Sequence, residues 1–136
     1  FNKVLATENS RPSIQALREN VKLNNIENVY TGRLSGKETL EAFKGVRIFR
    51  RLKDIDLEQF EIDSIFLDPP REGLDPFTLQ NIIGIKNIIY ISCSFDSFKR
   101  DIQALKATHD ILKLAMFDQF PYTEHIESGA ILRKKY

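Results

Sequence analysis

Tryptophan is absent from this chain of 136 residues, and cysteine, histidine and methionine are almost absent. The single cysteine cannot form a disulfide within the chain or supply a cysteine-based zinc site, so a reducing cytoplasm is the natural setting. His109 and His125 are isolated in the sequence. We therefore expect packing or surface roles for the two histidines and no metal site.

Long hydrophobic runs and an excess of charge of one sign are also missing. No stretch of about 18 apolar residues occurs, which excludes a transmembrane helix. The formal net charge is +1, so composition does not indicate a nucleic-acid binder. A basic surface would have to come from clustering, and the alternative for such a cluster is an ordinary solvated face. The one candidate cluster consists of Arg47, Arg50, Arg51 and Lys53.

The chain has the length and apolar content of one globular domain. Its 136 residues, 42% of them apolar, can bury a single core. The sequence opens at Phe1, within an apolar run and without a methionine. We expect a fragment of a longer protein.

Short β-branched runs alternate with longer amphipathic stretches, a pattern typical of an α/β layered fold. Helices are expected to begin at the capping residues Ser10 and Asp75, and over residues 36–43 and 95–105. Residues 45–60 lack a pattern and predict a loop with at most one helical turn. The nearly all-apolar run at 87–92 predicts a strand covered on both faces. Strands are expected over residues 1–7, 28–31, 62–67, 87–92, 111–117 and 126–132.

Three reactive side chains, Glu8, Asp68 and Cys93, follow predicted strands. In open α/β sheets, ligands bind at the carboxyl ends of the strands. An acid at the position of Glu8 often binds ribose hydroxyls, and the alternative role is a favourable interaction with the next helix N-terminus. Asp68 begins the sequence DPPREG, whose stiff proline turn can hold Asp68 and Arg71 against a planar ligand. The alternative is a loop that only ends the strand.

The sequence allows two interpretations, one catalytic and one structural, for Cys93 and also for the segment 118–127. Cys93 precedes a predicted helix, whose N-terminus favours a reactive thiolate, but a lone cysteine also serves as a small buried apolar group. The segment 118–127 (DQFPYTEHIE) carries three carboxylates beside a predicted turn at Pro121. Composition does not say which of them is a base, and a hairpin rim of solvated acids is the alternative.

Three motifs together resemble the RNA uracil-C5 methyltransferases: residues 66–75 (FLDPPREGLD), 90–93 (YISC) and 117–127 (FDQFPYTEHIE). The similarity is strongest to the bacterial tRNA (uracil-5-)-methyltransferase branch, which residues 4–8 and 45–52 also resemble, and it covers essentially the whole chain. The resemblance implies a Rossmann-like class I methyltransferase fold. Such a fold has a mostly parallel sheet, helices on both faces and an antiparallel last strand.

The resemblance also implies roles for single residues. Cys93 is the implied catalytic nucleophile and Glu127 the base that removes the C5 proton. Glu8 and Asp68 match the acids that bind the cofactor S-adenosylmethionine, and Arg71 matches a position that holds the substrate. The implied partner is tRNA, in which a T-loop uridine becomes 5-methyluridine, and the chemistry needs no metal.

Two features depart from the family's pattern. Ser94 and Phe95 follow the cysteine where the family usually has Asn-Pro, although Ser94 can still cap the helix. The family's glycine-rich first strand and loop have no counterpart in the sequence. We therefore expect residues 1–136 to be the C-terminal part of the catalytic domain, without the first strand and the RNA-binding region, and with an incomplete cofactor pocket.

Three other functions remain open. The 23S ribosomal-RNA branch of the same family performs the same chemistry on another RNA. An amino-group methyltransferase of the Asp-Pro-Pro-aromatic kind is disfavoured by Arg71 and Cys93. A non-catalytic RNA-binding or nucleotide-binding module is disfavoured by the presence of Cys93 together with Glu127.

Overall fold

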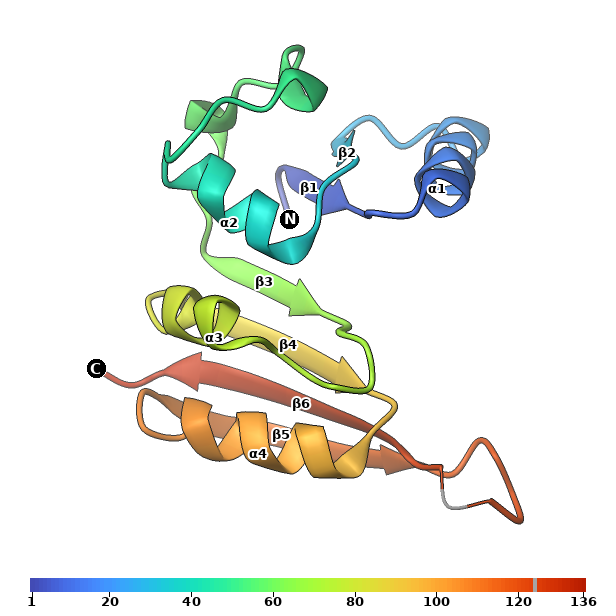
Figure 1. The fold of residues 1–136 in the computed structure, drawn as a ribbon, viewed down its shortest axis with the longest axis vertical. Coiled ribbons are helices and arrows are strands. Elements are labelled where there is room, and N and C mark those ends of the chain that lie inside the picture. The colour runs from blue at the N-terminus through green and yellow to red at the C-terminus, as the bar shows by residue number, and fades with distance from the viewer. Residues whose placement is uncertain (124) are drawn as a thin grey trace. The chain divides into compact units, whose positions relative to one another are not determined.

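The computed structural model describes residues 1–123 and 125–136, and Glu124 of the acidic segment lies outside the described residues. The described strands form two separate sheets (Figure 1). The chain divides into two compact units, Phe1–Glu61 and Ile62–Tyr136, each with a sheet of its own. No helix among the described residues is long and apolar enough to cross a membrane.

The first unit begins with a strand–helix–strand arrangement: β1 (Val4–Thr7), α1 (Arg11–Leu23) and β2 (Val29–Gly32). The two strands are parallel, with Val4 opposite Val29. Helix α1 begins where the sequence predicts, because the Ser10 hydroxyl accepts the backbone N–H of Ser13 and Pro12 lies in the first turn. Ile14 is the buried residue of this helix.

The remainder of the first unit contains α2 (Gly36–Phe43) and two short 3-10 helices, η1 (Arg50–Leu52) and η2 (Leu57–Gln59). Helix α2 matches the predicted range and starts with a reciprocal capping box between Ser35 and Glu38. The segment 45–60 has more helical structure than predicted. Buried Leu34, Phe49 and Leu52 form a small core that anchors this charged segment.

The second unit is a four-stranded sheet in the order β3-β4-β6-β5. Its strands are β3 (Ser64–Leu67), β4 (Asn87–Ser92), β5 (His109–Phe117) and β6 (Glu127–Lys134). Strand β3 is parallel to β4, and β6 is antiparallel to both β4 and β5. Three of the strands therefore run in one direction and only the last is reversed, which confirms the predicted mostly parallel sheet with an antiparallel last strand.

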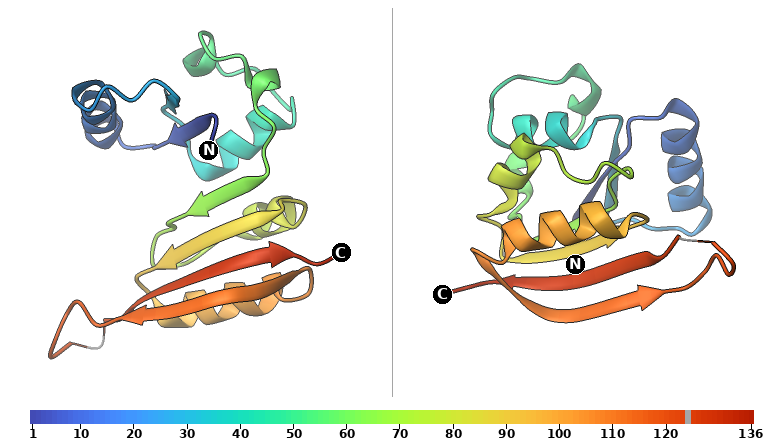
Figure 2. Two further views of the ribbon diagram at one scale, coloured as in Figure 1. Left: turned by 180° about the vertical axis from the view of Figure 1, so that it is seen from behind. Right: turned by 60° about the horizontal axis from the view of Figure 1, so that its bottom comes forward.

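Both helices of the second unit, α3 (Pro76–Ile82) and α4 (Phe95–Leu105), lie on the same face of this sheet (Figure 2). Ile88, Tyr90 and Leu132 are fully buried on that face. Side chains alternate between the faces of a strand, so the intervening residues of β4 point the other way and are only half-buried. The expectation that helices cover both faces is therefore wrong for this sheet in the part of the chain described.

Candidate active site

The predicted site residues of the second unit gather at one end of its sheet. Strands β3 and β4 are parallel, with Leu67 opposite Tyr90. Asp68 follows the last residue of β3, and Cys93 follows the last residue of β4. Because parallel strands end at the same edge of a sheet, Asp68 and Cys93 lie at the edge where α/β folds bind ligands.

The register of β4 and β6 places Cys93 and Glu127 beside the same end of the ladder. The last pair of this antiparallel ladder is Ser92 opposite Ser128, and Cys93 and Glu127 are the next residues beyond this pair on the two segments. Both residues are half-buried. The two residues therefore adjoin the same pair of the sheet, Ser92 and Ser128.

Serine side chains shape the turn that follows Cys93. The Ser92 hydroxyl accepts the Ser94 N–H at 3.2 Å and donates to the Ser94 carbonyl at 3.1 Å. The Ser97 hydroxyl donates to the same carbonyl at 3.2 Å. Ser94 occupies the N-cap position of α4 as predicted, but its own hydroxyl makes no capping bond. Buried Ser92 is thus a structural part of the site that sequence reasoning missed, although its Ser-x-Ser spacing was visible.

The loop after β3 is a defined turn with exposed polar side chains. The Gly73 N–H donates to the Pro70 carbonyl at 2.8 Å, and Gly73 has a φ of +79°, which favours glycine. The Asp68 and Arg71 side chains are exposed. The loop is therefore an ordered turn whose Asp68 and Arg71 side chains face solvent.

Asp75 fixes the far end of this loop at the start of α3. Its carboxylate accepts the Thr78 hydroxyl at 2.6 Å and the Thr78 N–H at 3.0 Å. These hydrogen bonds hold the pKa of Asp75 below its ordinary value, although partial burial acts in the opposite direction. The predicted capping role of Asp75 is confirmed.

Helix α4 supplies a second, buried support for the loop. The fully buried Asp101 carboxylate accepts the Leu74 N–H at 2.8 Å and the Tyr90 hydroxyl at 2.7 Å. Burial, with the hydrogen bond to Asp101, raises the pKa of Tyr90 well above its usual value, so the phenol stays protonated and donates. Sequence reasoning did not single out Asp101. The available signal was a carboxylate three residues after Phe98, on the apolar face of the helix.

Glu8 belongs to the first unit and has a different environment. Its carboxylate accepts the Ser10 N–H at 2.7 Å, just ahead of α1, and its own N–H donates to the Gly32 carbonyl at 3.2 Å. The helix-start role considered for Glu8 is therefore present. This bond engages one carboxylate oxygen, Oε1. The other predicted site residues, Asp68, Arg71, Cys93 and Glu127, all belong to the second unit.

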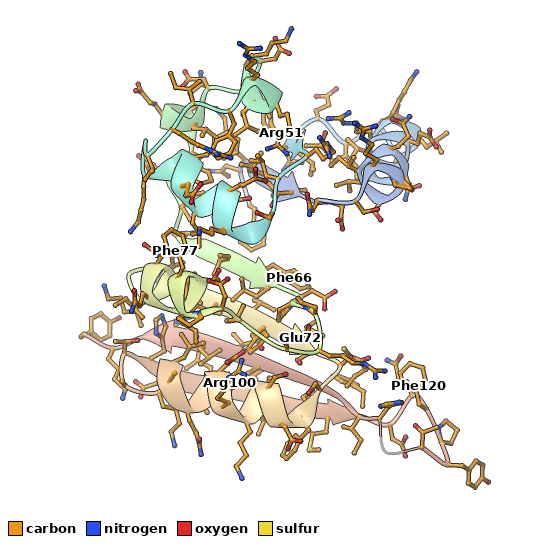
Figure 3. The ribbon with its side chains drawn as sticks, viewed as in Figure 1. Arg51, Phe66, Glu72, Phe77, Arg100 and Phe120 are labelled. Atoms are coloured by element: carbon orange, nitrogen blue, oxygen red, sulfur yellow. The ribbon has the colours of Figure 1, made fainter. Side chains whose placement is uncertain are left out.

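Two arginines of the basic cluster in the first unit form ion pairs with a carboxylate of the same unit. Arg47 and Arg51 both reach Glu38, at 3.1 and 2.6 Å. The Arg47 guanidinium also lies 4.2 Å from the centre of the Phe49 ring. The position of Arg51 in the first unit can be followed in Figure 3. The hydrogen bond from the Ser35 backbone, with help from these arginines, lowers the pKa of Glu38. These contacts favour the structural interpretation for two members of the cluster.

Comparison with solved structures defines the class of fold. The Pyrococcus abyssi tRNA (uracil-54, C5)-methyltransferase in complex with S-adenosyl-L-homocysteine superposes with a TM-score of 0.71 at 28% identity, over 96% of this chain and 28% of that one. An N-methyltransferase from Bradyrhizobium japonicum superposes with a TM-score of 0.65 at 10% identity, over 98% of this chain and 67% of that chain, and shows the fold alone. The fold is that of the class I S-adenosylmethionine-dependent methyltransferases.

Sequence comparison narrows this class to one family. The family model described as tRNA (Uracil-5-)-methyltransferase matches residues 1–135, and the chain belongs to this family. Curated relatives named tRNA/tmRNA (uracil-C(5))-methyltransferase include proteins of Sulfurovum sp. (50% identical over 99% of this chain) and Nitratiruptor sp. (51% over 98%). The chain spans only 36% and 37% of the lengths of these two relatives.

Proposed function

We propose that residues 1–136 are the C-terminal part of the catalytic domain of an S-adenosylmethionine-dependent tRNA uracil-C5 methyltransferase that works in the cytoplasm. The observation that carries the proposal is that Cys93 and Glu127 both adjoin the last β4–β6 pair, Ser92 and Ser128, in a chain of this family. The first strand and an RNA-binding region would belong to the remainder of the longer protein.

Uracil methylation at C5 calls for a nucleophile, because C5 alone reacts poorly with a methyl sulfonium. The Cys93 thiolate adds to C6, forms a C–S bond and moves the electrons of the C5=C6 double bond into an enolate. S-adenosylmethionine, when bound, supplies the methyl group as a sulfonium. The enolate carbon C5 then forms the new C–C bond, and the sulfonium sulfur keeps the electron pair of the bond that breaks.

Glu127 completes the reaction by accepting the C5 proton. The electron pair of the broken C–H bond restores the C5=C6 double bond and expels the Cys93 thiolate from C6. A base must lie within hydrogen-bond reach of the proton that it removes. The position of Glu127 beside the same end of the β4–β6 ladder as Cys93 supports this role, because both side chains would act on the same ring.

The carboxylates of Glu8 and Asp68 suit the cofactor. Each follows a parallel strand of its own unit, where acids of α/β folds accept hydrogen bonds from nucleoside hydroxyls. The exposed Arg71 guanidinium, in the same loop as Asp68, can stack on a base or bind a phosphate of the substrate. The target uridine must leave its stack to reach Cys93, so base flipping is part of the proposal.

The finer substrate assignment is a T-loop uridine of tRNA, converted to 5-methyluridine. It is supported by the family of the chain and by the P. abyssi protein, whose name specifies uracil-54 of tRNA. The curated relatives carry tRNA and tmRNA in their names. No feature of the described residues favours 23S ribosomal RNA over these substrates.

The test of the nucleophile is Cys93→Ser in the full-length protein. An alcohol is hardly ionised near neutral pH, so we expect kcat to fall on the order of 10³-fold or more. RNA affinity, measured by filter binding, should stay within about twofold, because phosphate contacts and shape dominate it. Methylation of tRNA by the serine variant at the wild-type rate would remove Cys93 as the nucleophile.

A further inference from the structure

We propose that Arg100 and Asp101 of α4 are a positioning pair that sets the place of the loop at residues 68–75 relative to Cys93. This inference rests on the proposed function, because it concerns the loop that carries Asp68 and Arg71. Neither Arg100 nor Asp101 touches the proposed site directly, so both would act through the loop.

The Asp101 carboxylate ties three elements together. Its Oδ2 accepts the Leu74 N–H of the loop at 2.8 Å and the Tyr90 hydroxyl of β4 at 2.7 Å. Its Oδ1 accepts from Arg100, at 2.9 Å from Nε and 2.8 Å from Nη2. Asp101 is fully buried, so water does not compete for these bonds. One carboxylate therefore relates the loop to the strand that ends just before Cys93.

Arg100 extends this contact to the carbonyl groups of the loop. Its Nη2 donates to the Glu72 carbonyl at 2.8 Å and to the Leu74 carbonyl at 3.4 Å. Figure 3 shows Arg100 on α4 beside Glu72 of the loop. Loop carbonyls have no ladder or helix partners, and charge-assisted bonds from a guanidinium are among the stronger ones available. The pair thus binds the loop backbone at both Glu72 and Leu74.

Gly73 shows how closely the loop is pressed against the pair. A Cβ at this position would lie 2.5 Å from Asp101 Oδ2, 2.6 Å from Arg100 Nη2 and 2.9 Å from the Ser97 Cβ. Its φ of +79° also disfavours any side chain. The close approach leaves the loop little freedom to shift over α4.

The Arg100–Asp101 pair is connected to Cys93 through β4, which precedes the cysteine, and through α4, which follows it. Tyr90 lies in β4, three residues before Cys93, and α4 begins at Phe95, two residues after it. Catalytic groups must be held within about 0.5 Å of a productive geometry. A shift of about 1 Å can cost roughly 100-fold in rate. A buried contact between the two site segments therefore has a functional consequence beyond stability.

The test uses the full-length protein with Asp101→Asn, and Ile102→Val as the matched control. The asparagine keeps the size but points an N–H donor at groups that are themselves donors. Ile102 is the next residue of α4, is 7% exposed, and has no hydrogen-bonding side chain. Both variants should lower Tm. At a temperature where both are folded, we expect Asp101→Asn to lower kcat/KM roughly 10-fold or more, with a raised KM for S-adenosylmethionine, and Ile102→Val to leave both unchanged.

Two further measurements separate this inference from the proposed function. Adduct formation with tRNA containing 5-fluorouridine follows Cys93 attack directly, because fluorine at C5 cannot leave as a proton. Hydrogen exchange of the amides at residues 71–75 follows the loop without any catalysis. We expect slower adduct formation and faster loop exchange in Asp101→Asn. A wild-type protein that forms no adduct would overturn the proposed function but leave the exchange result as a test of the pair.

An Asp101→Asn protein with wild-type kcat/KM and unchanged loop exchange would overturn the inference alone. Should that variant fail to fold, Arg100→Lys takes its place. Lysine keeps the positive charge and leaves Asp101 bonded to Leu74 and Tyr90, but it cannot span the carbonyls of Glu72 and Leu74 with a rigid fork. Arg100→Lys should show a several-fold loss of kcat/KM, and normal kinetics in this variant would likewise overturn the inference.

Discussion

At the scale of single residues, Cys93 and Glu127 are held by different means. The turn after Cys93 is fixed by the buried Ser92 hydroxyl, which binds both backbone groups of Ser94. Glu127 is the first residue of β6 and is placed by the antiparallel ladder with β5, where it lies opposite Phe117. The two residues are thus positioned by different elements, a turn in one case and a strand pair in the other.

The role of Glu127 can be separated from that of Cys93 by Glu127→Gln in the full-length protein. Glutamine keeps the size and hydrogen bonding but cannot accept the C5 proton. We expect the reaction to stall after methyl transfer, with methylated RNA held covalently through Cys93. The measurement is a slowly migrating RNA–protein band on a denaturing gel.

The matched control for this prediction is Asp118→Asn, which changes an exposed acid of the same hairpin. This control should turn over normally and build up no adduct. Near-normal turnover of Glu127→Gln would mean that Glu127 is a rim carboxylate. Loss of both adduct and product would place Glu127 earlier, in positioning or in activation of the cysteine.

At the scale of elements, the second sheet has one covered face and one open face. Helices α3 and α4 cover the face that contains Ile88 and Tyr90. On β6, Leu132 is 0% exposed and the neighbouring Ile131 is 37% exposed. Adjacent strand residues point to opposite faces, so this difference follows directly from the placement of the two helices.

Because one face of the sheet is covered and the other is exposed, truncating neighbouring side chains of the 136-residue chain should lower its free energy of unfolding by different amounts. Leu132→Ala removes a fully buried side chain and should lower the free energy of unfolding by about 2–5 kcal/mol. Ile131→Ala removes a partly exposed side chain and should cost about 1 kcal/mol. Urea unfolding followed by circular dichroism measures both. Equal losses for the two variants would contradict the one-sided burial.

At the scale of the whole molecule, the two acids proposed for the cofactor belong to different units. Glu8 follows β1 in the unit Phe1–Glu61, and Asp68 follows β3 in the unit Ile62–Tyr136. No hydrogen-bonded ladder joins the two sheets among the described residues. The chain also spans only 36% of the length of its Sulfurovum relative.

We therefore expect the isolated 136-residue chain to bind S-adenosyl-L-homocysteine weakly or not at all, and the full-length protein to bind it far more tightly. Each contact of about 1.4 kcal/mol contributes tenfold in affinity, so two or three missing contacts would weaken binding roughly 10²–10³-fold. Calorimetric titration of both proteins provides the comparison. Tight stoichiometric binding by the isolated chain would show that its pocket is complete.

Local signals in the sequence were sufficient for several elements of the fold. The ranges of β4 and α4 and the start of α3 at Asp75 agree with prediction, because apolar periodicity and capping residues act over a few positions. The segment 45–60 was underestimated, since its short helices depend on Phe49 and Leu52 reaching a core made with Leu34. That packing has no local signature.

The motifs in the sequence identified the family and named the candidate residues, because each motif is contiguous and each chemical group belongs to one residue. Their spatial relation came only from the tertiary structure. Cys93 and Glu127 are 34 residues apart in sequence (127 − 93), and only the pairing of β4 with β6 places both beside the pair Ser92–Ser128. The contact of Asp101 with Leu74 likewise joins residues 27 apart. Such long-range pairings are decided by burial and by the satisfaction of backbone groups in the folded chain, and no local stretch of sequence encodes them.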